Sequence, residues 1–169
     1  MEFSIPKFSL VLLIGVSSSG KSTFARKHFK RTEILSSDFF RGLVADDEND
    51  QGATRDAFEV LMCVAKKRLS SKRLTVIDAT NVEEKARRKW HNLSREIHCP
   101  TVAILLNLPI HIVEERHAKR DDRNFPFGII TKQFDNFERS IFQTTLEEFD
   151  QHIMLSSIDE INNASFTRK

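Results

Sequence analysis

The eight residues from Gly15 to Ser22 have the types and the spacing of a loop that binds phosphate groups. They read Gly-Val-Ser-Ser-Ser-Gly-Lys-Ser and fit the pattern G-x-x-x-x-G-K-[ST]. The two glycines let the backbone curl, so that successive N–H groups point inward at phosphate oxygens. We therefore expect a nucleotide to be contacted by Gly15, Ser17, Ser18, Ser19, Gly20, Lys21, Ser22 and Thr23.

Individual residues of this loop predict binding of ATP and Mg²⁺. Lys21 would reach the β- and γ-phosphates, and the Ser22 hydroxyl would ligate the metal. A helix beginning near Lys21 would add the positive end of its dipole to the same anion. A buried apolar strand over Phe8–Ile14 and a helix over Lys21–Phe29 flank the loop. This context favours a nucleotide site over a serine-rich turn that merely joins a strand to a helix.

A candidate general base follows the next expected strand. Asp38 lies just past the strand Glu33–Leu35, at the edge of the sheet where the phosphate loop lies. A carboxylate there can accept the proton of an attacking hydroxyl. Arg41 is three residues on and would share a helical face with Asp38. The alternative is that Ser36, Ser37 and Asp38 cap the turn that follows them.

A second carboxylate, Asp78, ends the expected strand Leu74–Ile77. In phosphoryl-transfer proteins a residue at this place lies near the magnesium ion, so we expect Asp78 to contact the metal through water. The segment from Asp78 to Asn81 is also a candidate turn, with Asn81 as the cap of the next helix. The two interpretations are compatible.

Arg116, Arg120 and Arg123 are spaced to form a cationic stripe. On a helix they fall within about 60° of one another. Such a stripe beside a phosphate loop predicts a lid over about residues 115–128 that contacts ATP as the site closes. The break at Phe125–Gly128 would serve as its hinge. A solvated helix of mixed charge is the alternative, and we expect solvation for the basic cluster Lys85–Lys89.

The order of apolar runs predicts the fold class. Five short strands, including Thr101–Leu108 and His152–Leu155, alternate with helices, which indicates a parallel sheet covered on both faces. The expected architecture is a P-loop NTPase-type three-layer α/β/α sandwich with a helical lid, similar to adenylate kinases. Further helices are expected at a turn over Phe39–Val44 and over Ala53–Leu69, Glu83–Ile97, Ile110–Arg123 and from Ile130 onward, followed by a polar tail over Asn162–Lys169.

Composition excludes several other classes of protein. The 169 residues are 40% hydrophobic and 30% charged with a net charge of +2, as in an ordinary globular domain. The longest apolar run is too short for a membrane span, so no membrane association is expected. Cys63 and Cys99 are expected to be buried, reduced thiols. Together with an N-terminus unlike a signal peptide, they predict a cytoplasmic location.

Taken together, these motifs resemble the N-terminal kinase domain of bacterial polynucleotide kinase-phosphatases, which heal and seal RNA ends in RNA repair. The resemblance extends from the first strand to at least Lys132. Besides the phosphate loop it rests on the run from Ser36 to Gln51, on the Asp-Ala-Thr-Asn sequence at 78–81 and on Asn107–Pro109. The run from Ser36 to Gln51 is far more specific than the phosphate loop.

The resemblance implies a kinase that transfers the γ-phosphate of ATP to the 5'-hydroxyl end of RNA or DNA. Asp38 would be the general base, Arg41 would hold the acceptor nucleotide or its 3' phosphate, and the lid arginines would lie over ATP. In that family the kinase is fused to phosphatase and ligase domains, so residues 1–169 are expected to be one domain of a longer polypeptide. A P-loop kinase of a small acceptor, such as a nucleoside, a sugar or adenylylsulfate, remains the alternative, because the same groups serve any hydroxyl.

Overall fold

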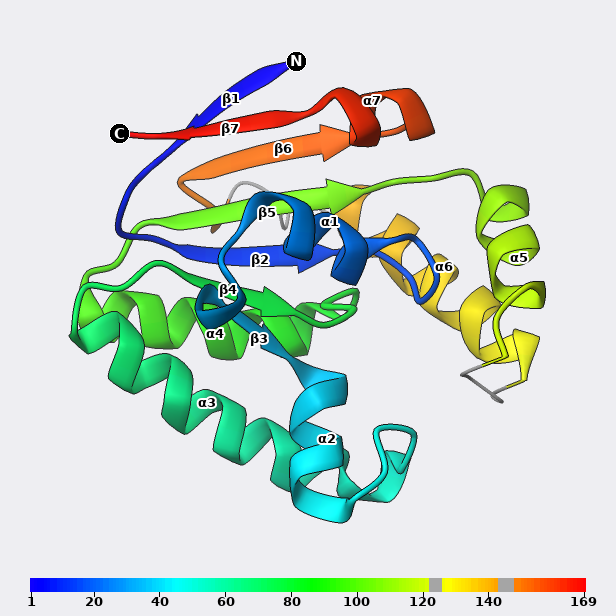
Figure 1. Ribbon diagram of the computed structural model, residues 1–169, viewed down its shortest axis with the longest axis horizontal. Helices are drawn as coiled ribbons and strands as arrows, with labels where there is room; N and C mark the ends of the chain where they lie inside the picture. Colours follow the sequence, from blue (N-terminus) through cyan, green and yellow to red (C-terminus); the bar gives the residue numbers. More distant parts are fainter. Residues whose placement is uncertain (122–125, 143–147) are drawn as a thin grey trace.

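The computed structural model describes residues 1–121, 126–142 and 148–169, and its centre is a five-stranded parallel sheet (Figure 1). The strands lie in the order β3-β4-β2-β5-β6, and all four neighbouring pairs are parallel. The predicted three-layer α/β/α class is confirmed, and all five expected strands are present. Their bounds are Leu10–Ile14 (β2), Ile34–Ser36 (β3), Thr75–Asp78 (β4), Thr101–Leu106 (β5) and Gln151–Leu155 (β6).

The central strand β2 and its neighbour β5 are buried on both faces because helices cover each side of the sheet. Leu10, Leu12 and Ile14 pack on the face covered by α3 (Thr54–Ser70), α4 (Glu84–Ile97) and α6 (Phe127–Phe142). Val11 and Leu13 point to the opposite face and pack against α1 (Lys21–His28). This alternation follows from the two-residue period of a strand. The central strand is therefore buried on both faces up to Ile14, where the phosphate loop begins.

The remaining helices depart from the sequence expectations in length. The turn after β3 is a helix of nine residues, α2 (Ser37–Ala45), and a short 3₁₀ turn, η2 (Gln51–Ala53), follows the acidic loop. The helix α5 (Ile110–Ala118) ends five residues before the expected Arg123. Cys63 is exposed rather than buried, whereas Cys99 is buried as expected, and burial raises the pKa of its thiol to about 11. Among the described residues, no helix is long and apolar enough to cross a membrane.

The two ends of the chain form a second, smaller sheet that the sequence analysis did not predict. β1 (Glu2–Ile5) pairs in parallel with β7 (Ser165–Arg168) (Figure 1). The expected polar tail over Asn162–Lys169 therefore contains the end of a helix, α7 (Ile158–Asn163), and the strand β7. The ring of Phe166 in β7 packs against Phe24 of α1 and against Phe29, which follows the helix. Arg168 adds a two-armed ion pair to Glu33, at 2.6 and 2.7 Å.

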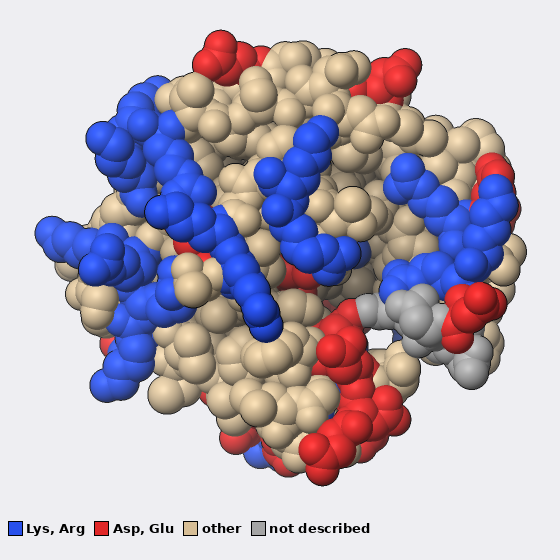
Figure 2. Space-filling view, in the orientation of Figure 1, with Lys and Arg blue, Asp and Glu red and all other residues tan. Residues whose placement is uncertain are grey.

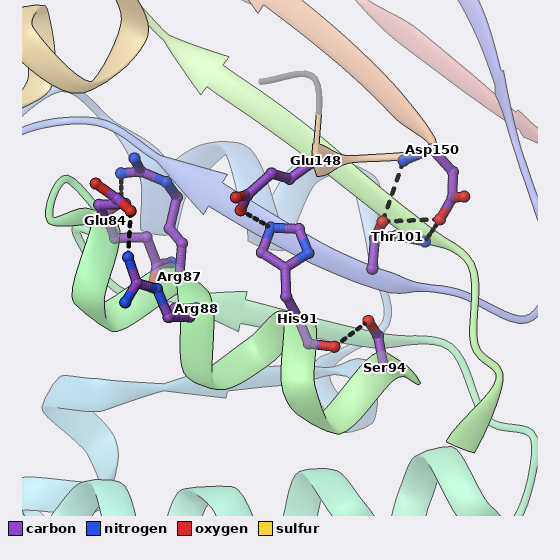
Figure 3. A network of polar contacts seen from close by, with 9 residues as sticks. Glu84, Arg87, Arg88, His91, Ser94, Thr101, Glu148 and Asp150 are labelled. Carbon is purple, nitrogen blue, oxygen red and sulfur yellow. Dashed lines mark hydrogen bonds and ion pairs between the residues drawn. The ribbon is translucent and has the colours of Figure 1, made fainter. Parts of the chain in front are cut away.

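A polar network fastens the amino ends of β5 and β6 (Figure 3). One oxygen of the Asp150 carboxylate accepts the backbone N–H of Thr101 at 2.7 Å and the Thr101 hydroxyl at 2.8 Å. Nearby, Nε2 of the buried His91 lies 3.4 Å from Glu148. Within the described part of the chain, no group of three or more His, Cys, Asp or Glu residues has the arrangement of a metal site. We therefore interpret this network as a fastening of α4 and the sheet.

Substituting Asp150 by asparagine should weaken the fold at neutral pH but not in acid. The N–H and hydroxyl of Thr101 hold the pKa of this carboxyl below its ordinary value. The stabilisation is therefore present above the unfolded-state pKa of about 3.9 and is lost as the pH falls through the lower folded-state value. We expect a loss of about 1 kcal/mol at pH 7, a value already reduced for solvent screening. Urea unfolding between pH 7 and pH 3 measures it, with the exposed Asp135→Asn as control; a difference that persists at pH 3 contradicts it.

Candidate functional site

The loop between β2 and α1 has the backbone that the phosphate-loop motif requires. Gly20 has φ +101°, and Ser18 also has a positive φ of 66°. A side chain at Gly20 would place its Cβ 3.1 Å from Nη1 of Arg116, and one at Gly15 would place its Cβ 2.9 Å from the Leu106 carbonyl oxygen. Glycine is therefore needed at both positions, for conformation at the first and for close approach at the second.

Lys21 and the serines of the loop surround a space suited to phosphate. The Lys21 ammonium is buried and donates a hydrogen bond of 2.7 Å to the Val16 carbonyl, which holds the side chain folded over the loop. The hydroxyls of Ser18 and Ser19 are buried without a hydrogen-bond partner among the residues described. Buried polar groups are normally paired, so these two hydroxyls fit a site that is completed by an anionic ligand such as a nucleotide phosphate.

Ser22 and Asp78 supply the oxygen atoms that a magnesium ion would need. Asp78 is the last residue of β4 and is 5% exposed, and its carboxylate accepts a hydrogen bond from the Ser22 hydroxyl. Burial raises the pKa of Asp78, against the opposing effects of Lys21, Ser22 and Arg26. Mg²⁺ is commonly held through one or two carboxylates and several waters. The pair therefore fits a metal held by the Ser22 hydroxyl, with Asp78 acting directly or through water.

The segment that follows Asp78 is locked against the phosphate loop. Asn81 has a positive φ of 50°, and its Nδ2 donates to the Leu13 carbonyl at 2.8 Å. The Gly15 N–H donates to the Thr80 carbonyl at 3.0 Å. Asn81 is not the cap of the next helix, because α4 begins at Glu84. Its carbonyl instead accepts a hydrogen bond of 2.8 Å from Nη1 of Arg87. Arg87 is only 2% exposed, so this member of the basic cluster Lys85–Lys89 is not solvated as expected.

Asp38 and Arg41 are paired in the first turns of α2. Ser36 occupies the cap position without a side-chain capping bond, and the Asp38 carboxylate accepts a hydrogen bond from Nη2 of Arg41. The Arg41 Nε donates to the Glu48 carbonyl at 2.8 Å, and its side chain is only 8% exposed. Asp38 is more open, with 18% of its side chain exposed. Arg41 therefore lies behind Asp38 and connects it to the acidic loop.

These groups meet in one cavity of about 880 Å³ at the carboxyl edge of the sheet. Its size lies within the range of pockets that hold small ligands. The predicted residues that line it are Ser17, Ser18, Gly20, Lys21, Ser22, Thr23, Asp38, Asp78, Arg116 and Arg120. Gly15, Ser19 and Arg41 are not among the lining residues. The sequence analysis missed lining contributions from Arg26, Lys27, Arg31, Phe39, Glu48, Ile161 and Asn162.

The arginine segment approaches the phosphate loop from α5. Nη1 of Arg116 donates to the Ser19 carbonyl at 3.0 Å. Arg120 lies just beyond the end of α5 and lines the same cavity. Arg123, and the part of the expected lid and hinge at 122–125, lie outside the described residues. Two of the three predicted arginines are thus brought to the nucleotide loop.

A glutamine of α6 also contacts the phosphate loop. Oε1 of Gln133 accepts the Ser17 N–H at 2.8 Å, across 116 residues of sequence. The helix α6 is therefore hydrogen-bonded to the same phosphate loop that Arg116 contacts. No local pattern identifies Gln133, because its partner is a backbone group far away in the chain.

Replacing Arg116 by alanine should raise the KM for ATP about tenfold and leave the Tm nearly unchanged, because a bidentate cation next to the phosphates is lost while no core contact is removed. Lysine at this position should restore the affinity only in part, since it lacks the planar fork. The measurement is the ATP dependence of phosphoryl transfer, with Lys119→Ala as a neighbouring control. Unchanged ATP kinetics in Arg116→Ala would favour the solvated-helix interpretation.

The fold and the loop together define a P-loop protein of kinase type, in which the phosphate loop follows the central strand β2 of a parallel sheet. One carboxylate, Asp78, ends the neighbouring strand β4, and the other, Asp38, lies in the helix that follows the edge strand β3. A family model described as an AAA domain matches residues 10–144, and the chain belongs to this AAA domain family. ATP binding with Mg²⁺ is typical of proteins of this type.

Comparisons with individual proteins find two kinases and a chain of an RNA repair complex. The chain is 27% identical over 171 residues to L-seryl-tRNA(Sec) kinase of Methanococcus maripaludis, covering 90% of this chain and 66% of that protein. A chain of the Pnkp1/Rnl/Hen1 RNA repair complex has a TM-score of 0.69 at 22% identity, with 82% and 47% covered. APS kinase CysC of Mycobacterium tuberculosis has a TM-score of 0.55 at 19% identity, with 92% and 94% covered. The structural matches establish the fold, and the chain spans only 66% and 47% of the first two proteins.

Proposed function

We propose that the protein is a polynucleotide 5'-hydroxyl kinase, which transfers the γ-phosphate of ATP to the 5'-OH end of RNA or DNA in nucleic-acid repair. The observation that carries the proposal is the position of Asp38, whose carboxylate lines the same cavity as Lys21 and Ser22 and is held from behind by Arg41. A hydroxyl acceptor entering this cavity finds a base at one end and a phosphate loop at the other.

Each group has a defined task in this proposal. When bound, ATP supplies the phosphoryl group and Mg²⁺ neutralises charge on it. Asp38 takes the proton of the 5'-hydroxyl as the new bond to phosphorus forms and the bond to the β-phosphate oxygen breaks, which releases ADP. Lys21 and Arg116 stabilise the negative charge on the phosphates. Ser22 and Asp78 would hold the metal, and Arg41 orients Asp38.

The named relatives support a nucleic-acid acceptor. One is a kinase of a tRNA-linked serine, and another belongs to an RNA repair complex. The run from Ser36 to Gln51, which carries the resemblance to polynucleotide kinase-phosphatases, forms the acceptor side of the cavity through Asp38 and Glu48. We also propose, from the same resemblance, that phosphatase and ligase domains accompany this domain in the whole protein. Separately, the two free cysteines lead us to propose that it works in the cytoplasm.

A kinase of a small acceptor is the second candidate. The observation that favours it is the match to APS kinase CysC, which covers 94% of that chain against 47% for the repair-complex chain. Asp38 and the phosphate loop would act on a small hydroxyl compound in the same way. The two candidates therefore differ in what the acceptor side of the cavity binds, and not in the transfer step.

The deciding experiment measures transfer of labelled γ-phosphate from ATP to a panel of acceptors at equal concentration. The panel contains 5'-OH RNA and DNA oligonucleotides, seryl-tRNA, a nucleoside, its 3'-monophosphate, a sugar and adenylylsulfate. We expect the 5'-OH oligonucleotides to have the highest kcat/KM and the same oligonucleotides carrying a 5' phosphate to be inert. A higher kcat/KM for adenylylsulfate or a sugar would establish the second candidate, and one for seryl-tRNA would overturn both.

A further inference from the structure

The cavity continues from the acceptor side into a groove between α1 and β3. Its lining includes Arg26 of α1, Arg31 of the 3₁₀ turn η1 (Arg31–Glu33), and Ile34 and Ser36 of β3. β3 is the edge strand of the sheet, so no further strand covers its outer side. Arg26 lies one helical turn beyond Ser22, about 6 Å along the axis of α1. The groove thus begins beside Ser22 and Asp38 and leads away from the phosphate loop.

The wall of this groove carries two cations, Arg26 and Arg31, of which Arg26 also acts at longer range on the buried Asp78 carboxylate. Arg26 and Arg31 are both exposed, and among residues 1–121, 126–142 and 148–169 no carboxylate forms an ion pair with either guanidinium. Figure 2 shows basic side chains over α1 and the segment after it, while acidic side chains gather around the segment that follows α2. An anionic chain is therefore attracted to the α1 side of the site and repelled from the acidic loop.

An aromatic ring stands where the groove meets the candidate base. Phe39 follows Asp38 in α2, lines the cavity and is 53% exposed. Its ring meets that of the buried Phe40 edge to face, with centroids 5.6 Å apart, which steadies it. Exposure of a large apolar ring is unfavourable in water. A nucleobase stacked on the ring would remove it from water, and such stacking tolerates any base.

We infer that the groove between α1 and β3 binds the single-stranded acceptor, with Phe39 stacking the 5'-terminal base and Arg26 and Arg31 neutralising the phosphates that follow it. The inference rests on the proposed function and adds the path of the strand to it. The path runs from the reacting 5'-hydroxyl at Asp38 along α1 toward the start of β3. Because both interactions are independent of sequence, the groove selects single strands without selecting bases.

The cations are tested with the double variant Arg26→Gln/Arg31→Gln. Its KM for an acceptor of about twelve nucleotides should rise about tenfold, and it should lose most of the advantage of this acceptor over a nucleoside 3'-monophosphate. In a fluorescence anisotropy titration with the same labelled oligonucleotide, the plot of log affinity against log salt should become shallower by about 1.4, or 0.7 for each lost phosphate contact. The matched control is Arg73→Gln/Arg88→Gln, which removes the same charge from outside the cavity.

The ring is tested with Phe39→Ala and Phe39→Trp. Loss of stacking should weaken binding of the oligonucleotide about tenfold and leave the salt dependence unchanged, because no charge is removed. Tryptophan should restore the binding. A merely structural role for Phe39 predicts a lowered Tm without this restoration.

The outcomes separate the groove from the proposed function. Suppose that wild-type protein phosphorylates oligonucleotides, but that Arg26→Gln/Arg31→Gln has the same acceptor KM and the same salt dependence as the control Arg73→Gln/Arg88→Gln. The inferred strand path along the groove is then wrong, and the proposed polynucleotide kinase activity stands. If wild-type protein phosphorylates small acceptors and not oligonucleotides, the proposed function fails and the groove fails with it. The strand path is supported if the salt dependence becomes shallower in Arg26→Gln/Arg31→Gln alone and if Phe39→Trp restores the oligonucleotide binding that Phe39→Ala loses.

Discussion

Alanine in place of Lys21 is expected to reduce phosphoryl transfer about a thousandfold without unfolding the protein. The ammonium lies over the phosphate loop, and the motif assigns it to the β- and γ-phosphates of ATP. Its loss therefore removes charge stabilisation where negative charge develops. The side chain donates a hydrogen bond to the Val16 carbonyl and belongs to neither apolar cluster, so we expect the apolar core to be unaffected by the substitution. The measurements are kcat/KM with labelled ATP and the Tm.

Lys66→Ala is the control, because Lys66 is an exposed lysine on α3 that pairs with Glu96. It should retain the wild-type rate and Tm within experimental error. If Lys21→Ala retained near-normal turnover with ATP, the loop would not be a nucleotide site in this protein. If it instead lowered the Tm by many degrees, the loss of activity would report unfolding and Lys21 would have a structural role.

Asparagine in place of Asp38 should lower kcat by about a hundredfold to ten-thousandfold while ATP still binds. The substitution preserves the shape of the side chain and its hydrogen bond from Arg41 but removes the group that accepts a proton. The check is single-turnover transfer to a 5'-OH oligonucleotide, together with ATP binding by titration. A wild-type rate for Asp38→Asn would exclude Asp38 as the base.

Arg41→Ala separates two roles for Arg41. The geometry behind Asp38 predicts a fall in kcat with little change in the acceptor KM, because the base loses its alignment. The role implied by the family resemblance is binding of the acceptor 3' phosphate. It predicts a raised acceptor KM with little change in kcat. It also predicts that the preference for a nucleoside 3'-monophosphate over the nucleoside is lost in Arg41→Ala. The ratio of the two kcat/KM values in wild type and variant decides between them.

The parts of the site that the sequence predicted are those whose chemistry lies in consecutive residues. The curl of Gly15 to Ser22 and the placement of Asp78 at a strand end follow from local pattern, and the structure shows both. The strands β2 and β5 were equally predictable, because both are short, fully buried apolar runs between turns. Their order in the sheet depends on which helix covers which face, which no single run of residues encodes.

The features that the sequence did not predict depend on contacts between distant residues. Arg87 sits in a cluster of basic residues and has the appearance of a surface charge, yet it is buried by its bond to the Asn81 carbonyl. The contact of Gln133 with Ser17 has no local signature either. The tail after Asn162 is polar on average, and its strand is stabilised by pairing with β1 at the opposite end of the sequence. Composition could not reveal that partner.

The pairing of β1 with β7 has a consequence for how the protein is made. Glu2 is aligned with Ser165, so the ladder joins segments that a ribosome synthesises roughly 10–30 s apart. Until β7 emerges, α1 lacks the ring of Phe166, which covers Phe24 and Phe29 in the finished fold. The same helix begins at Lys21. During biosynthesis the helix behind the nucleotide loop therefore acquires its last packing partner, and with it its final rigidity, only when residues 165–168 have left the ribosome.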